Sequence, residues 1–258
     1  MSETTPRGRF VWYDLVTTDP GGAADFYTKV AGWGTQDWPG SPTPYTMWTT
    51  KDTPIGGVMK MMPEMQGAMP PHWIGYVSVP DVDASAKDAE ALGGKVLTAP
   101  MDIPEVGRFA VISDPQGAAI AIFTPNRAPR DTDERPNVGE MSWHELTTTD
   151  HAKAYEFSQT LFGWQKTNSF DMGEMGEYQI YGRGDLELGG MWTKPADMPM
   201  PPNWLYYIRV PSVDEAAERV KALGGQVLNG PMDVPGGDRI AQCLDPQGAA
   251  FAVHSRAD

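Results

Sequence analysis

An internal repeat is the feature that most constrains how this chain can fold. The segment WHELTTTD, which begins at Trp143, matches the segment WYDLVTTD, which begins at Trp12, and each segment runs on to a Gly-Trp pair. The tryptophan of that pair is Trp33 in the first copy and Trp164 in the second, so both landmarks recur after 131 residues and the copies align without a gap. A chain of 258 residues with such a repeat is expected to fold as two similar domains.

Each copy begins with a strand that leads into a helix. Threonine, aromatic and leucine residues predict the strand, and Asp19 stands where a helix N-cap is expected, ahead of about three turns of small and apolar residues. Side chains alternate along a strand. Trp143 and Glu145 therefore share one face, as do Trp12 and Asp14 in the first copy, so each repeat is expected to present an indole and a carboxylate on one surface.

The pattern of a strand, a helix and further strands occurs twice within each repeat. In the first repeat we predict strands over residues 9–17, 45–49, 55–62, 73–79, 96–97, 108–113 and 118–123. We predict helices over residues 19–31 and from Asp81 or Asp83 to Leu92. Residues 34–44 and 101–104 are predicted to be loops, because Pro, Gly and Asp interrupt any apolar period there.

The second half of the chain repeats these landmarks. The turn sequence DPQGAA begins at Asp114 and again at Asp245, so that the whole chain contains four strand-helix-strands units. Pro, Arg and Asp replace any apolar period between the halves. We therefore predict an α+β protein with domains over residues 1–125 and 139–258 and a linker over residues 126–138.

Composition disfavours several classes of protein. The chain has 34 acidic and 20 basic residues, a net charge of −14 and no cluster of Lys and Arg, which disfavours a nucleic-acid partner. No run approaches the roughly 18 apolar residues of a membrane span, and the segment before Arg9 lacks the apolar core of a signal peptide. Cys243 is the only cysteine, so no intrachain disulfide can form. We expect a cytoplasmic monomer or homodimer that binds a small molecule.

These landmarks resemble the vicinal-oxygen-chelate superfamily, which includes glyoxalase I, bleomycin-resistance proteins and extradiol dioxygenases. Residues 25–32 are similar to the first-helix motif of that superfamily, and residues 114–117 are similar to its closing hairpin. The resemblance covers nearly the whole chain. It implies tandem glyoxalase-like domains, each built of two paired βαβββ modules whose curled mixed sheets surround a cavity.

The resemblance also locates the positions that hold the metal ion in metal-dependent members. Those positions fall on tryptophan, aliphatic or alanine side chains in both repeats, namely Trp12, Ile74 and Ala121 in the first and Trp143, Leu205 and Ala252 in the second. None of these side chains is a ligand type for zinc, iron or nickel. We therefore expect no metal and no other cofactor. A displaced metal site remains an alternative, and it would use some of Asp14, Glu145, His72 and His254.

Asp14 and Glu145 are the candidate catalytic residues. A carboxylate walled by Trp and Met would have a raised pKa, which suits a general base, whereas one paired with Arg209 would stay ionised and anchor a ligand hydroxyl. In the structural alternative, each carboxylate only stabilises the sheet. Candidate ligand-binding residues are Trp12, Trp48, Met59, His72, Tyr76, Trp143, Tyr181, Met191, Tyr207 and Arg209. Ordinary core packing is the alternative for the aromatic and Met residues among them.

The expected function is binding of a small apolar, aromatic or carbonyl-containing molecule in metal-free cavities, as in bleomycin-resistance-type proteins. The first alternative is a metal-independent lyase, isomerase or hydrolase with Glu145 as general base, and the second is a metal-dependent glyoxalase or dioxygenase. A protein that serves only as an interaction surface would have cavities filled by side chains. The sequence shows no Ser-His-Asp order, phosphate-binding loop or Cys-x-x-Cys pair, so covalent catalysis and nucleotide binding are not expected.

Overall fold

The computed structural model describes residues 6–41, 43–127 and 134–256. The helices are α1 (Pro20–Val30), α2 (Val82–Ala91), α3 (His151–Phe162) and α4 (Val213–Ala222), with short 3-10 helices at Pro63–Met65 and Gly173–Met175. The strands of the first half are β1 (Phe10–Thr17), β2 (Gly34–Asp37), β3 (Tyr45–Thr50), β4 (Thr53–Lys60), β5 (His72–Ser78), β6 (Lys95–Ile103), β7 (Gly107–Ser113) and β8 (Ala119–Pro125). Those of the second half are β9 (Met141–Thr148), β10 (Gln165–Asp171), β11 (Glu177–Arg183), β12 (Leu186–Thr193), β13 (Asn203–Arg209), β14 (Gln226–Asp233), β15 (Arg239–Leu244) and β16 (Ala250–Ser255). Part of the predicted linker over residues 126–138 lies outside the described residues.

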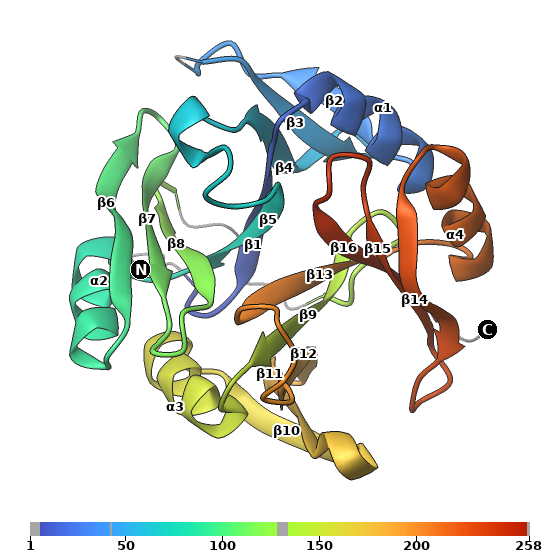
Figure 1. Ribbon diagram of the computed structural model, residues 1–258. Coiled ribbons are helices and arrows are strands. Elements are labelled where there is room, and N and C mark those ends of the chain that lie inside the picture. The colour runs from blue at the N-terminus through green and yellow to red at the C-terminus, as the bar shows by residue number, and fades with distance from the viewer. Residues whose placement is uncertain (1–5, 42, 128–133, 257–258) are drawn as a thin grey trace. The chain divides into compact units, whose positions relative to one another are not determined.

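The strands form two eight-stranded sheets with the same order. One sheet runs β2-β3-β4-β1-β5-β8-β7-β6, and the other runs β10-β11-β12-β9-β13-β16-β15-β14. Both sheets are mixed, because β1 pairs with β4 in parallel while β3 pairs with β4 antiparallel, and the second sheet repeats this arrangement. Each sheet consists of two βαβββ modules, such as β1-α1-β2-β3-β4 (Figure 1). The predicted α+β class and the module pattern are confirmed.

Two of the predicted loops are wrong in the same way. Residues 34–37 form β2, and β6 continues to Ile103 through the segment predicted to be a loop. All four residues of β2 are exposed, and β6 alternates between exposed and half-buried side chains. Both strands lie at sheet edges. Because edge strands bury few side chains, their sequences lack the apolar pattern by which a strand is recognised.

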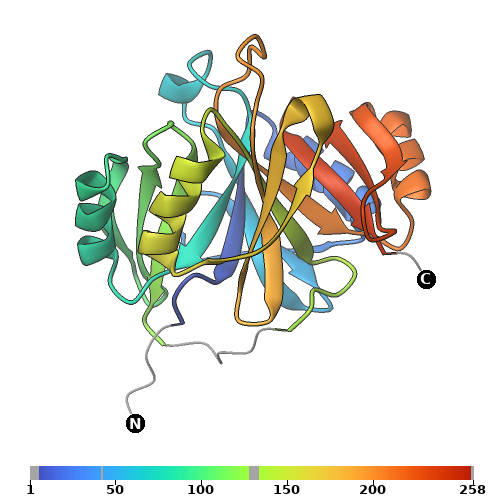
Figure 2. The same cartoon turned by 90° about the horizontal axis from the view of Figure 1, so that it is seen from below.

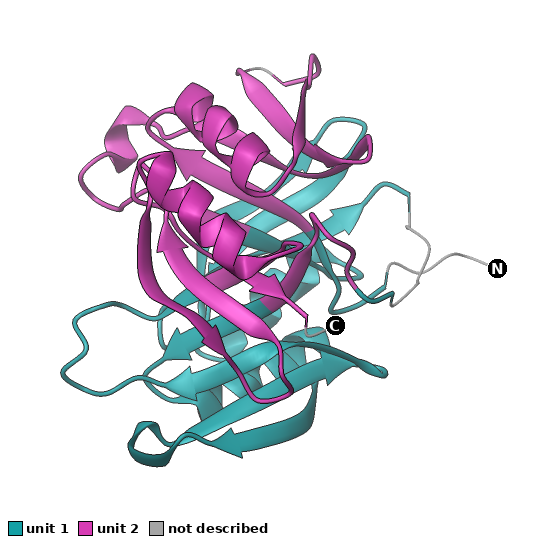
Figure 3. Cartoon of the chain, turned by 90° about the vertical axis from the view of Figure 1, so that its right-hand side faces the viewer, with its two compact units in different colours: residues 1–11, 75–135, 144–204 teal, residues 12–74, 136–143, 205–258 magenta. Residues whose placement is uncertain are grey.

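Contacts divide the chain into two compact units that do not follow the repeat. Unit 1 comprises residues 1–11, 75–135 and 144–204, and unit 2 comprises residues 12–74, 136–143 and 205–258 (Figure 3). Each unit therefore takes one module from each half of the chain. Within unit 1, α2 packs beside α3, and within unit 2, α1 packs beside α4 (Figure 2). None of the helices in the described residues has the length and apolar character needed to cross a membrane.

The Gly-Trp pair of each repeat belongs to an aromatic core. In unit 2, Trp33 packs with other buried rings, namely Tyr27, Trp48 and Trp73. Its indole N–H donates to the carbonyl oxygen of Gly139 at 2.6 Å. In unit 1, the indole of Trp164 donates to the carbonyl oxygen of Gly8 at 2.7 Å. Gly8 and Gly139 are themselves 131 residues apart, so the conserved spacing of these tryptophans in the two repeats is explained by packing and a buried hydrogen bond.

Candidate functional site

A carboxylate in unit 2 is held by two aromatic donors. The Asp14 side chain is only 3% exposed. Its Oδ1 accepts hydrogen bonds from the Tyr45 hydroxyl at 2.6 Å and from the Trp12 indole N–H at 2.9 Å. That indole N–H also lies 2.8 Å from the Tyr45 oxygen. Burial, together with the neighbouring Asp14 charge, holds the pKa of the Tyr45 hydroxyl well above its usual range, so this hydroxyl remains a protonated donor.

A glycine makes room for the tyrosine ring. Gly57 on β4 is the register partner of Asp14 on β1 and of Met47 on β3. A methyl group at Gly57 would overlap the Tyr45 ring, so the ring lies across the sheet above this glycine. Glycine inside a strand often marks a bulge or the close approach of another group, and at Gly57 the approaching group is a side chain of the protein.

Unit 1 repeats the arrangement with a longer acid. The Tyr178 hydroxyl on β11 donates to Glu145 Oε2 on β9 at 2.9 Å, and Glu145 is 9% exposed. Gly190 on β12 is the register partner of both Glu145 and Ile180. A methyl group at Gly190 would overlap the Tyr178 ring. The two repeats therefore share an acid, a tyrosine and a glycine at matching strand positions, which we call the carboxylate–tyrosine pairs.

The two tyrosines were absent from the predicted site. A signal for them exists in the sequence, because Tyr45 and Tyr178 each precede the second glycine of a Gly-Gly pair by twelve residues. In an antiparallel pair of strands, that spacing brings the tyrosine to a position next to the glycine on the same face. Only the strand register shows that the ring then reaches the acid on the next strand.

Three predicted ligand-binding residues lie on the face opposite the acids. Trp48 is fully buried in the aromatic core, and its indole donates to the Gly57 carbonyl at 2.8 Å. Tyr181 is fully buried, stacks on Trp164 with ring centroids 4.5 Å apart, and donates to the carbonyl of His144 at 3.0 Å. Met191 is fully buried opposite Leu146, the residue that follows Glu145 and faces away from it. The structure does not bring these three side chains to the carboxylate–tyrosine pairs.

The remaining predicted residues lie on several surfaces. Met59 shares the Asp14 face and is half-buried, while the ring nitrogen Nδ1 of His72 lies 2.9 Å from the Pro70 carbonyl. In unit 1, the Tyr76 ring packs near the rings of Phe109 and Phe123. In unit 2, Trp143 packs on a cluster formed by Leu205, Tyr207 and Ala252, and the Tyr207 hydroxyl accepts from Gln242 at 3.1 Å. Arg209, predicted as a partner of Glu145, donates to the Pro136 carbonyl.

Side chains at the inherited metal positions do not fit a metal ion. Trp12 offers an N–H that is already donated to Asp14, and an indole has no free lone pair to give a cation. Leu205 and Ala252 form part of an apolar cluster. Across residues 6–41, 43–127 and 134–256, no group of three or more His, Cys, Asp or Glu is placed to hold a metal ion. No chemical step is therefore assigned to a metal here.

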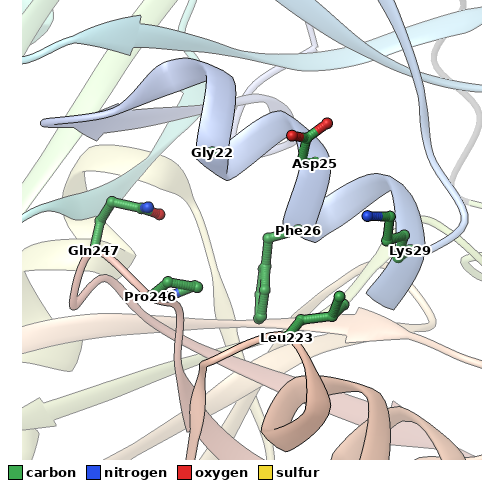
Figure 4. A pocket seen from close by; sticks show the side chains of 7 residues that line it. All are labelled: Gly22, Asp25, Phe26, Lys29, Leu223, Pro246 and Gln247. Carbon is green, nitrogen blue, oxygen red and sulfur yellow. The ribbon is translucent and has the colours of Figure 1, made fainter.

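A separate pocket of about 280 Å³ lies on the helical side of unit 2. Asp25, Phe26 and Lys29 line it from α1, and Leu223, Pro246 and Gln247 line it from the segments that face this helix (Figure 4). Gly22 completes the lining. None of these residues belongs to either carboxylate–tyrosine pair.

Comparisons with known proteins agree with this architecture. Residues 11–123 match the family model described as a glyoxalase-like domain, and residues 141–253 match that of the glyoxalase/bleomycin resistance protein/dioxygenase superfamily. The chain is 36% identical over 245 residues to the protein named "Putative glyoxylase CFP32" of Mycobacterium tuberculosis, which covers 94% of this chain and 92% of that protein. It is 31% identical over 261 residues to the anthracycline biosynthesis protein DnrV of Streptomyces peucetius, covering 95% of this chain and 92% of that protein.

Solved structures share the fold at low sequence identity. The Mn(II)-bound glyoxalase from Novosphingobium aromaticivorans superimposes with a TM-score of 0.65 at 17% identity, covering 99% of this chain and 83% of that one. The dioxygenase LapB from Pseudomonas sp. KL28 superimposes with a TM-score of 0.69 at 12% identity, covering 99% and 94%. The chain belongs to the glyoxalase/bleomycin resistance/dioxygenase superfamily and carries two glyoxalase-like domains in tandem.

Proposed function

We propose that this protein binds a small planar molecule with carbonyl or hydroxyl groups against the sheet faces that carry the carboxylate–tyrosine pairs. The supporting observation is the exposure of the Asp14 face. Trp12, Tyr45, Met47 and Met59 are only half-buried there, whereas the central side chains of the opposite face are buried, namely Tyr13, Leu15, Trp48 and Val58. Partly exposed aromatic and Met side chains around a fixed polar group form the kind of surface on which flat apolar ligands stack.

The polar groups would orient such a ligand. A ligand hydroxyl can donate to the carboxylate of Asp14 or Glu145, or to the oxygen of Tyr45 or Tyr178, because each tyrosine donates its single hydrogen to the acid and keeps its acceptor capacity. The name of one relative refers to anthracycline biosynthesis, and anthracyclines are planar aromatic compounds that carry ketone and hydroxyl groups. The proposed ligand class is compatible with that name, and no particular compound is singled out.

Titration with alizarin, a planar hydroxylated quinone, tests the proposal. Binding should quench the tryptophan fluorescence saturably, and Tyr45→Phe or Tyr178→Phe should each weaken one phase by about five- to tenfold, the value of one hydrogen bond. Tyr155→Phe removes a hydroxyl that bonds to the backbone around Trp164 and Lys166, and it should leave the affinity unchanged. Unchanged affinity in both site variants, with the fold intact, would place the binding surface elsewhere.

A second candidate function is metal-independent proton transfer by Glu145, with Tyr178 as a donor to the developing oxyanion. The 2.9 Å bond between these two groups favours it, because the tyrosine hydrogen that Glu145 accepts is released for the oxyanion when the carboxylate takes up a proton. Glu145→Gln separates the two functions. A base would lose turnover while affinity stays nearly intact, since the amide cannot take a proton, whereas an anchor would lose affinity.

A further inference from the structure

Three polar side chains far apart in the sequence meet in unit 2. The Ser142 hydroxyl at the start of β9 lies 2.8 Å from Nδ1 of His254 on β16. The other ring nitrogen, Nε2, lies 2.9 Å from Oδ2 of Asp238, in the loop that precedes β15. Ser142 and His254 are separated by 112 residues, which is why the sequence shows no motif for them. Neither residue is part of a carboxylate–tyrosine pair.

The partners of His254 decide which ring nitrogen carries the proton. An ionised Asp238 can only accept, so Nε2 must carry a hydrogen and donate it. In the neutral ring, Nδ1 is then left with a lone pair that faces the Ser142 hydroxyl. Ser142 also lies 3.3 Å from the Tyr207 carbonyl, a longer contact than the one to the ring. The arrangement is therefore serine to histidine to aspartate, with the base lone pair directed at the hydroxyl.

The cluster is fixed rather than solvated. Ser142 is 9% exposed and His254 is 8% exposed. Asp238 is more open, but its backbone carbonyl accepts from Val234 at 2.8 Å and closes a tight turn. Burial depresses the pKa of His254, the charges of Arg256 and Arg209 act in the same direction, and Asp238 opposes them. The ring is consequently held neutral, as a base must be, at neutral pH.

The first repeat shows that the fold does not need these residues. The positions 131 residues earlier are occupied by Val11, Gly107 and Phe123. The strand register is the same in both repeats, since Phe123 pairs with Phe109 where His254 pairs with Ile240. The same fold thus forms with Val11, Gly107 and Phe123 at these positions. The three polar residues of the second repeat therefore require an explanation other than folding.

Apolar side chains adjoin Ser142, His254 and Asp238. Tyr207 pairs with Ala252 and Arg209 pairs with His254, so the histidine continues the face that carries the Leu205–Tyr207–Ala252 cluster. Half-buried Ile240 pairs directly with His254 on the same face. The cluster itself is buried, and the partly buried Trp143 and Ile240 side chains that pack against it would contact a small apolar acyl group. The Arg209 guanidinium, close enough to act on the histidine charge, supplies positive potential for a developing oxyanion.

We propose that Ser142, His254 and Asp238 form a nucleophilic site that hydrolyses small esters with an apolar acyl group. Ser142 Oγ attacks the carbonyl carbon while its proton moves to His254 Nδ1. The C–O bond to the alcohol then breaks, and the leaving oxygen takes that proton. Water, deprotonated by the same nitrogen, attacks the acyl-serine and releases the carboxylic acid and the free serine. The net reaction consumes one ester and one water and needs no other reactant.

A fluorophosphonate probe and p-nitrophenyl acetate test the proposal on the full chain. The probe should form one covalent adduct per chain, which mass spectrometry should locate at Ser142, and the ester should be hydrolysed above the background rate. Ser142→Ala should remove the adduct. His254→Phe, which installs the residue of the first repeat, should lower the rate of labelling and of hydrolysis by about a hundredfold or more. Asp238→Asn should lower both rates less.

Controls separate this chemistry from a structural role. Ser255→Ala removes a neighbouring serine on β16 that is 8% exposed, and it should leave labelling unchanged. Circular dichroism should show His254→Phe folded, as expected from the first repeat. Absence of an adduct in the folded parent protein would overturn the proposal. Labelling of Ser142 that persists at the parent rate in folded His254→Phe would also overturn it, because the histidine would then not be the base.

Discussion

His144 should make the protein sensitive to mild acid. Its side chain is 4% exposed and stacks on Phe10 in unit 1, with ring centroids 3.7 Å apart and planes within 3°. Nδ1 donates to the Leu188 carbonyl at 2.6 Å, since a carbonyl oxygen can only accept. Burial lowers the pKa of His144 to about 4, and the hydrogen bond to Leu188 opposes this shift. The neutral ring therefore fits its site, and a charged ring does not.

The magnitude follows from linkage between protonation and folding. In the unfolded chain the pKa of histidine is about 6.5. Because the pKa in the folded state is lower, the unfolded state takes up the proton first as the pH falls. The stabilisation is thus complete above about pH 6.5 and is lost towards pH 4. From these two values, the loss is about 2 kcal/mol at pH 5 and approaches about 3 kcal/mol below pH 4.

Urea unfolding at pH 8 and pH 5, followed by tryptophan fluorescence, measures this loss. His144→Phe keeps an aromatic ring but cannot titrate, so its own destabilisation should be the same at both pH values. The free energy of unfolding of the parent should fall by about 2 kcal/mol more than that of the variant. Other titrating groups are common to both proteins and cancel in the comparison. Equal losses in the two proteins would refute the reasoning.

Three further substitutions have defined outcomes. Gly190→Ala should push the Tyr178 ring off the sheet and weaken alizarin binding in that repeat, and unchanged quenching titrations would contradict this. Trp164→Phe should lower the free energy of unfolding by about 1–3 kcal/mol, because the Gly8 carbonyl loses a buried donor. Urea unfolding measures this loss of stability, and a change near zero would contradict the prediction. Asp114→Ala should lower the free energy of unfolding by about 2 kcal/mol or more in the same assay, because Asp114 Oδ1 accepts from three backbone N–H groups. Asp114→Asn should lower it less, and equal losses for the two variants would contradict this prediction.

The repeat made the fold predictable, because a spacing of 131 residues aligns helix caps, turns and strands without any knowledge of packing. The predicted N-cap at Asp19 is observed, with its side chain accepting from the Gly22 N–H. The edge strand β2 and the end of the edge strand β6 escaped prediction because none of their side chains is fully buried. The predicted strand at Val96 and Leu97, for example, extends through residues whose alternation is only between exposed and half-buried.

The candidate site was harder to predict because it depends on which face each side chain takes. The sequence places Trp12 with Asp14 correctly on one strand. It cannot show that Trp48 faces the helix while Tyr45, three residues earlier, faces the acid, because that depends on the register of β3 with β4. A shift of one residue would exchange the two side chains. Contacts over more than a hundred residues, such as that between Ser142 and His254, leave no local pattern at all.

The difference in length between Asp14 and Glu145 supports one last prediction. Both acids have a glycine as register partner on the next strand, and both accept from a tyrosine in the same relative position. Asp14 already reaches Tyr45 in the same arrangement of strands, so the extra methylene of Glu145 is not needed for the bond to Tyr178. We propose that it extends the carboxylate towards the bound ligand. If Glu145 anchors a ligand hydroxyl, Glu145→Asp should keep the protein folded but weaken alizarin by about five- to tenfold, while anthraquinone, which lacks the hydroxyls, should bind as it does to the parent. Fluorescence titration with both compounds measures the difference. Equal losses for the two compounds would mean that the substitution disturbs the surface as a whole, and no loss for either would mean that Glu145 stabilises the sheet and does not contact the ligand.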